Sequence, residues 1–113
     1  MNENTFIPGS QYESNVSAEE HSQFTQIFSL ITARMAQAMA DGLSADSEEM
    51  QEAVRDHYTF ILRFWTPNRE TYKSLAMSYI LPTDFKDHYD AVSPGLGQYI
   101  YQAVCIWADK NLE

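Results

Sequence analysis

Cysteine, glycine, proline and long apolar runs are all scarce in this chain of 113 residues, and each scarcity excludes a class of protein. The single cysteine, Cys105, excludes an internal disulfide framework and fits the reducing cytoplasm, where we expect the protein to act. Only 4 glycines and 4 prolines occur, which favours helices over a turn-rich β fold. No apolar run approaches the length of about 20 residues that a membrane span requires.

Basic residues are also few, because 7 Lys and Arg stand against 16 Asp and Glu and give a formal net charge of −9. Proteins that bind DNA or RNA directly need Lys and Arg to neutralise phosphates, so we expect no direct nucleic-acid binding by this chain. Binding to an anionic membrane surface is disfavoured for the same reason. An acidic surface of this kind most often serves solubility.

The chain does contain enough apolar mass for one modest core. Hydrophobic residues make up 44% and aromatic residues 13%, and 113 residues suffice for one domain. Residues 1–16 are polar and contain Pro8-Gly9, so we predict a flexible segment there and a folded domain over 17–113. The first residues also lack the basic and apolar regions of a signal peptide.

Periodicity and capping signals predict about five helices and an all-α fold. The first helix is predicted to begin after Ser17, which forms a capping box with Glu20, and to end at Gly42. The second is predicted to begin at Asp46 or Ser47 and to carry an apolar stripe as far as Trp65. The later helices are predicted to begin at Thr66-Pro67, at Thr83 and at Ser93-Pro94.

The last helix is apolar on two sides. An advance of about 100° per residue places Leu96, Tyr99, Ile100, Ala103 and Trp107 on one side. The opposite side carries Tyr101, Cys105, Ala108 and Leu112, where a surface helix should be polar. The helix is therefore expected to lie between two packed layers, to line a cleft, or to pair with another chain as in a homodimer.

The residue patterns of catalysis and metal binding are not met. No spacing brings a base to Cys105, and Gly95-Leu96-Gly97 lacks the strand that precedes a dinucleotide site. Asp84, Asp87 and His88 share a helical face, but a solvated polar surface explains them better than a metal site. We therefore expect no enzymatic activity, no metal and no cofactor.

Aromatic residues are concentrated on the second to fifth predicted helices. Buried tyrosine hydroxyls need hydrogen-bond partners, so these rings form either an ordinary core or the wall of a pocket for a large apolar ligand. His57 lies on an apolar stripe, where a histidine is most often buried with a single hydrogen bond. The composition alone leaves both alternatives open.

Several motifs, taken in order, resemble the TipA-type antibiotic-recognition domain (TipAS), the effector domain of some MerR-family transcriptional regulators. The resemblance extends from about Ser17 to Ala108, and its specificity lies in the order and spacing of the motifs. They are Met39-x-x-Gly42, Gln51 with His57, the spacing from Tyr79 to Phe85 followed by Tyr89-Asp90, and Pro94-Gly95-Leu96 followed by Ala103-Val104.

The resemblance implies a globin-like helical fold that binds bulky apolar antibiotics, thiopeptides among them, in a hydrophobic cleft. Binding orders mobile segments in that family, and a linked DNA-binding module then activates resistance genes. By matching positions, Gly95 permits a tight turn into the last helix. The matching residues that line or brace the cleft are His57, Tyr79, Phe85 and Tyr89, and the helical stripes add Trp65, Tyr72, Tyr99 and Met39.

Three features depart from the family pattern. No basic helix-turn-helix precedes the domain, so we expect either the effector part of a regulator or a stand-alone drug-sequestering protein. Pro82 and Asp84 replace an acidic and a basic residue of the family. The family's reactive thiol falls near Thr66 whereas Cys105 lies elsewhere, so noncovalent binding is expected. The alternative function is a protein–protein interaction or dimerisation module that uses the second apolar face of the last helix.

Overall fold

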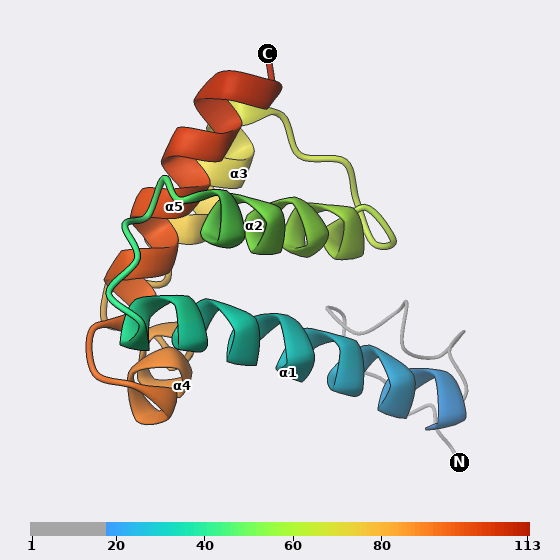
Figure 1. The fold of residues 1–113 in the computed structure, drawn as a ribbon. Coiled ribbons are helices and arrows are strands. Elements are labelled where there is room, and N and C mark those ends of the chain that lie inside the picture. The colour runs from blue at the N-terminus through green and yellow to red at the C-terminus, as the bar shows by residue number, and fades with distance from the viewer. Residues whose placement is uncertain (1–17) are drawn as a thin grey trace.

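The computed structural model describes residues 18–113, which form an all-α domain without a strand in that range (Figure 1). The all-α prediction is thereby confirmed. None of the helices in this range is long and apolar enough to cross a membrane. In chain order the helices are α1 (Ala18–Ala40), α2 (Glu48–Ile61), α3 (Arg69–Met77), α4 (Asp84–Val92) and α5 (Leu96–Asn111).

The last helix, α5, is the element on which the others pack. It contacts α1, α2, α3 and α4, while α1 and α2 run antiparallel beside each other (Figure 1). Of the placements expected for the last helix, the structure shows the one between packed elements. Ala108, on the second apolar side of α5, is fully buried, as this placement requires. The reason is that neighbouring helices cover α5 from more than one direction.

Helix α1 ends at the predicted glycine. Gly42 has φ of 78°, a left-handed conformation that side chains rarely adopt. Its N–H donates to the carbonyl of Met39 at 3.0 Å, and the N–H of Leu43 donates to the carbonyl of Ala38 at 3.1 Å. These two bonds form a Schellman motif, which satisfies carbonyls that the helix end leaves unpaired.

Two predicted N-caps are confirmed. The hydroxyl of Ser47 accepts a hydrogen bond from the N–H of Met50 at the start of α2. The hydroxyl of Thr83 accepts one from the N–H of Lys86 at the start of α4. The capping box predicted at Ser17 lies outside the described residues. Short polar side chains at these positions therefore set the helix starts by local hydrogen bonding.

The start predicted for the third helix was wrong. Its N-cap is Asn68, whose Oδ1 accepts from the N–H of Thr71 at 2.9 Å. The Thr71 hydroxyl in turn accepts from the N–H of Asn68 at 2.8 Å. This reciprocal pair satisfies two backbone N–H donors, so the helix begins after Asn68 and not at Thr66-Pro67. Pro67 is instead buried, and its carbonyl accepts a hydrogen bond of 2.9 Å from the Tyr58 hydroxyl.

The start predicted for the fifth helix was also wrong, because Pro94 lies before the helix and Gly95 is its N-cap. Gly95 has φ of 87°, so the tight turn predicted there is confirmed. The Asp90 carboxylate from α4 accepts hydrogen bonds from the N–H groups of Gly95 and Gly97. A Cβ at Gly97 would lie 2.2 Å from the carbonyl oxygen of Tyr79. The close approach of α5 to the end of α3 therefore requires glycine.

Candidate functional site

The buried histidine predicted on α2 lies inside a network of tyrosine hydroxyls. His57 Nδ1 is 2.8 Å from the hydroxyl oxygen of Tyr72, and Nε2 is 3.4 Å from that of Tyr79. A neutral imidazole offers one donor and one acceptor, so both nitrogens find a partner in this arrangement. Burial lowers the pKa of His57 from 6.5 to about 4 and keeps the ring neutral at physiological pH.

Two further predicted residues, Phe85 and Tyr89, adjoin this network through Tyr79. The rings of Tyr79 and Tyr89 meet edge to face with centroids 4.8 Å apart, and Phe85 packs against Tyr79 at 6.0 Å. Burial raises the pKa of Tyr79 to about 12. The structure thus brings His57, Tyr72, Tyr79 and Tyr89 together in the core, while Phe85 lies at the surface with 51% of its side chain exposed.

The other three predicted ligand residues lie apart from this network. Trp65 is 44% exposed in the connection after α2, because that helix ends at Ile61 and the predicted stripe does not continue to Trp65. The half-buried Tyr99 donates its hydroxyl to the carbonyl of Leu43 at 2.9 Å. Met39 is partly buried near the end of α1, where it packs against the core.

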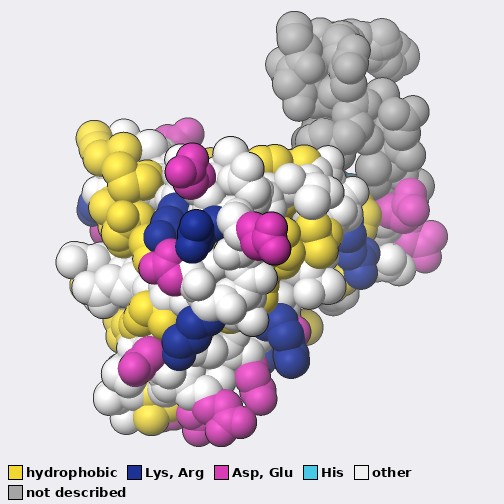
Figure 2. All heavy atoms as spheres, turned by 90° about the horizontal axis from the view of Figure 1, so that it is seen from above, with side chains coloured by type: hydrophobic (Ala, Val, Ile, Leu, Met, Phe, Trp, Pro, Cys, Tyr) yellow, Lys and Arg dark blue, Asp and Glu magenta, His cyan; other side chains and the backbone are white. Residues whose placement is uncertain are grey.

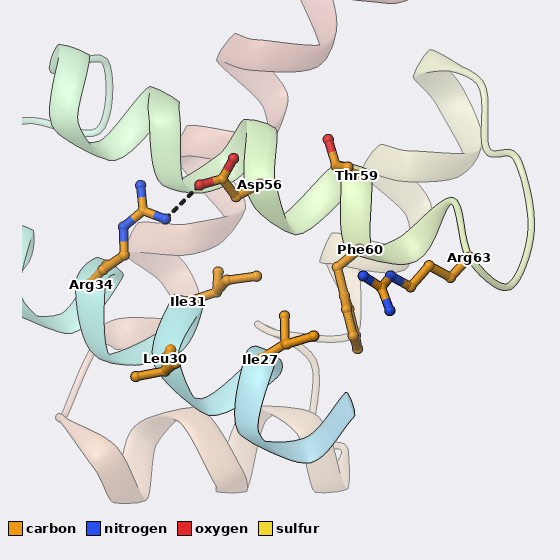
Figure 3. A pocket seen from close by; sticks show the side chains of 8 residues that line it. All are labelled: Ile27, Leu30, Ile31, Arg34, Asp56, Thr59, Phe60 and Arg63. Atoms are coloured by element: carbon orange, nitrogen blue, oxygen red, sulfur yellow. Dashed lines mark hydrogen bonds and ion pairs between the residues drawn. The ribbon is translucent and has the colours of Figure 1, made fainter. Parts of the chain in front are cut away.

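A groove of about 320 Å³ lies between α1 and α2 (Figure 3). Ile27 and Ile31 from α1 and Phe60 from α2 point toward one another across it. Leu30 stands at its edge with 66% exposure. The positions are three or four residues apart on both helices, so each helix presents one face. The complete lining is Ile27, Leu30, Ile31, Arg34, Asp56, Thr59, Phe60 and Arg63.

A row of phenylalanines continues the groove toward the surface. Phe24, Phe60 and Phe64 meet edge to face with centroids 5.4 to 6.2 Å apart. Phe28 joins this row to the buried network, because its ring lies 6.1 Å from Phe60 and 6.3 Å from His57. The wall of the groove is therefore in continuous aromatic contact with the core.

Charged side chains mark the two ends of the groove. At one end Arg34 Nη1 lies 2.6 Å from Asp56 Oδ2. At the other end the guanidinium carbon of Arg63 lies 5.5 Å from the centre of the Phe24 ring. Figure 2, a view of the molecule from above, shows hydrophobic side chains exposed at the surface among basic and acidic ones. The groove thus combines an apolar middle with polar ends.

The sequence prediction missed the residues of this groove. Phe24, Ile27, Phe28 and Ile31 recur at three- and four-residue spacing and form one apolar face of α1, but such spacing does not distinguish the wall of a groove from the core. The available signal was the matching three- and four-residue spacing on the second helix. This spacing identifies one apolar face on each helix but does not show which helices pack together. The groove could therefore not be predicted from it.

The half-buried thiol of Cys105 lies on α5, outside the groove and beside Tyr101, and it raises the pKa of the Tyr101 hydroxyl. With Ala108 buried, the second apolar face of α5 is reduced to Tyr101, Cys105 and Leu112, each partly buried. The face that was predicted to pair with another chain is therefore smaller than the sequence indicated. Within residues 18–113, no three His, Cys, Asp or Glu side chains are grouped as metal ligands would be.

Comparison with known proteins gives a family match and one structural match. The model of the family described as "TipAS antibiotic-recognition domain" matches residues 8–107. The HTH-type transcriptional regulator SkgA of Caulobacter vibrioides, found in two strains, is 28% identical over 92 residues, which are 80% of this chain and 36% of SkgA. The chain thus spans about a third of the length of these curated relatives.

The structural match is TipAS of Streptomyces lividans, solved in complex with nosiheptide as part of a thiopeptide antibiotic multidrug resistance system. The TM-score is 0.81 at 24% sequence identity. The alignment covers 96% of this chain and 77% of that chain. At this level of identity the match establishes a shared fold.

Proposed function

Because the chain belongs to the TipAS antibiotic-recognition domain family, we propose that it binds a bulky, largely apolar antibiotic in the groove between α1 and α2. The observation that carries this proposal is the apolar groove with its adjoining row of phenylalanines, of which Phe64 is exposed and Phe24, Phe28 and Phe60 are partly buried. Nosiheptide, the ligand of the structurally similar TipAS, suggests thiopeptides as the first class to test.

The lining of the groove suits such a ligand. Its apolar part is formed by Ile27, Ile31 and Phe60, and the charged groups lie toward its ends. Small-molecule sites are typically apolar with a few polar groups that orient the ligand. A thiopeptide is too large for a volume of about 320 Å³, so only part of it enters. The exposed edges of Leu30 and Phe64 extend the contact area.

The buried residues that were predicted to contact ligand have a supporting role in this proposal. Behind the groove lie His57, Tyr72, Tyr79 and Tyr89. The ring of Phe28 packs against His57 and Tyr89 and also against Phe60 in the wall of the groove. They brace the wall and are not accessible from the groove. Contact at Trp65, Phe85, Tyr99 and Met39 stays a prediction, which alanine variants of the exposed Trp65 and Phe85 test directly.

We place the chain as a noncatalytic binding domain. It acts either as the drug-sensing part of a transcriptional regulator or as a protein that sequesters drug. SkgA supports the first role because it is an HTH-type regulator, and this chain matches 36% of its length. Once a ligand is known, a gel-shift assay distinguishes the two roles. It measures whether the ligand changes DNA binding by a DNA-binding module that is fused to this chain or added separately.

Thermal and chemical unfolding with nosiheptide test the proposed function. A ligand at about one hundred times its Kd stabilises the fold by about 2.7 kcal/mol. Leu30→Glu should abolish this gain, because it places a charge at the edge of the groove without disturbing the core. Leu62→Glu is the matched control, since Leu62 is 42% exposed and does not line the groove.

Two results would contradict the proposed function. The first is the absence of stabilisation by nosiheptide and by every other member of a panel of thiopeptides and apolar antibiotics. The second is stabilisation that Leu30→Glu and Leu62→Glu reduce equally, because the bound site would then not be the groove. Circular dichroism of both variants without ligand verifies that they fold.

A further inference from the structure

Arg63 is a cation at the mouth of the groove. Its guanidinium lies over the ring of Phe24, and within residues 18–113 no carboxylate oxygen comes within 4.0 Å of it. In Figure 3 its side chain extends along the groove toward Phe60.

Within residues 18–113, the carboxylates that line the groove or the neighbouring hollow lie toward its Arg34 end. Asp56, the carboxylate of the lining, lies 2.6 Å from Arg34 and 3.7 Å from Arg55 and is therefore already paired. Glu49 and Glu52 line a neighbouring hollow that adjoins Arg34, at the opposite end from Arg63. An anion brought into the groove would thus meet carboxylates and their paired arginines at the Arg34 end. At the other end it would meet the Arg63 guanidinium, which has no ion pair with residues 18–113.

Stacking on Phe24 leaves the guanidinium able to bind an anion. A guanidinium that lies over a ring directs its N–H groups outward in its own plane. Those donors fit the two oxygens of a carboxylate or sulfonate.

We propose that the groove prefers aromatic ligands that carry a carboxylate or a sulfonate, and that Arg63 pairs with this anionic group while the ligand's rings lie against Phe60 and Phe24. The inference rests on the proposed function, since it specifies the chemistry of a ligand for the same groove. Arg63 is then the residue that selects among apolar ligands of similar size.

Two dyes that share one ring system test this preference. 1-Anilinonaphthalene-8-sulfonate is anionic, and N-phenyl-1-naphthylamine has the same rings without the sulfonate. Fluorescence titration of the whole chain gives a Kd for each dye. We expect Arg63→Gln to weaken binding of the sulfonate roughly three- to tenfold and to leave binding of the neutral dye unchanged within about twofold.

Arg69→Gln is the control for net charge, because it removes one cation at the start of α3, outside the groove. It should leave both dyes unaffected. Leu30→Glu should weaken both dyes, which verifies that they bind in the groove. Cooperative unfolding of each variant excludes dye binding to a partly unfolded state.

Each remaining outcome overturns the preference in a distinct way. If the neutral dye binds in the groove and Arg63→Gln changes both dyes equally or neither, the anionic class is wrong while the proposed function stands. If Arg69→Gln weakens the sulfonate as much as Arg63→Gln does, net charge and not Arg63 is responsible. If neither dye binds the wild-type chain, the preference is wrong, and the antibiotic titration decides separately on the proposed function.

Discussion

The Nδ1 atom of His57 lies 2.8 Å from the hydroxyl oxygen of Tyr72, and both side chains are almost completely buried. His57 comes from α2, which packs against α1, and Tyr72 comes from α3, which packs against α5. The contact therefore links one wall of the groove to the helix pair α3 and α5. A polar pair in such a place makes the fold sensitive to pH and to the loss of either partner.

The first prediction concerns pH. The pKa of His57 is about 4 in the folded state and near 6.5 when unfolded, so the unfolded chain binds the extra proton between these values. The free energy of unfolding should therefore fall as the pH decreases from about 6.5 to about 4, and His57 should contribute no pH dependence above that window. Its share between pH 7 and pH 4.5 is about 2 kcal/mol.

Urea unfolding at both pH values measures this contribution. Carboxylates also titrate in the window, so the informative quantity is the difference between wild type and His57→Gln, whose amide does not titrate. His88→Gln, which changes an exposed histidine, is the control. Equal pH dependence in wild type and His57→Gln would show that His57 is not the group responsible.

The second prediction concerns the Tyr72 hydroxyl. Tyr72→Phe keeps the ring but leaves His57 Nδ1 without its partner in the core. Loss of one partner of a buried hydrogen bond costs about 1–3 kcal/mol. Tyr101→Phe removes a hydroxyl from a partly exposed side chain and should cost within about 0.5 kcal/mol. Equilibrium unfolding at pH 7 compares the two, and equal losses would contradict a special role for Tyr72.

The third prediction concerns the close approach of α5 to the end of α3. Alanine is ordinarily better than glycine in a helix, but a Cβ at Gly97 would lie 2.2 Å from the backbone oxygen of Tyr79. Gly97→Ala should therefore destabilise the fold by about 1–3 kcal/mol. Gln98→Ala, at an exposed neighbouring position, should change stability by less than about 0.5 kcal/mol. A Gly97→Ala variant as stable as wild type would refute the steric argument.

The fourth prediction concerns covalent capture. Cys105 lies on α5 beside Tyr101 and does not line the groove, so a ligand bound there does not meet its thiol. Incubation with nosiheptide should leave the mass of the protein unchanged while unfolding experiments show binding. An adduct of the drug's mass that disappears in Cys105→Ser would overturn this expectation.

Local signals account for the parts of the fold that were predicted correctly. The cap at Ser47, the cap at Thr83 and the turn at Gly42 depend on hydrogen bonds within a few residues, so the sequence contains the necessary information. Thr66-Pro67 failed because a competing cap pair, Asn68 with Thr71, lies two residues further on. Choosing between neighbouring caps requires knowing how the chain packs, as the burial of Pro67 shows.

The sequence by itself determined the helical class, the limits at Gly42, Ser47 and Thr83 and the apolar faces, because periodicity and capping act over three or four residues. Only the tertiary structure decided that α1 and α2 pair to form the groove, and that Arg63 reaches its edge. It also decided that His57 meets tyrosines 15 and 22 residues away in the chain. Such contacts depend on how whole helices cross, which the spacing within one helix does not specify.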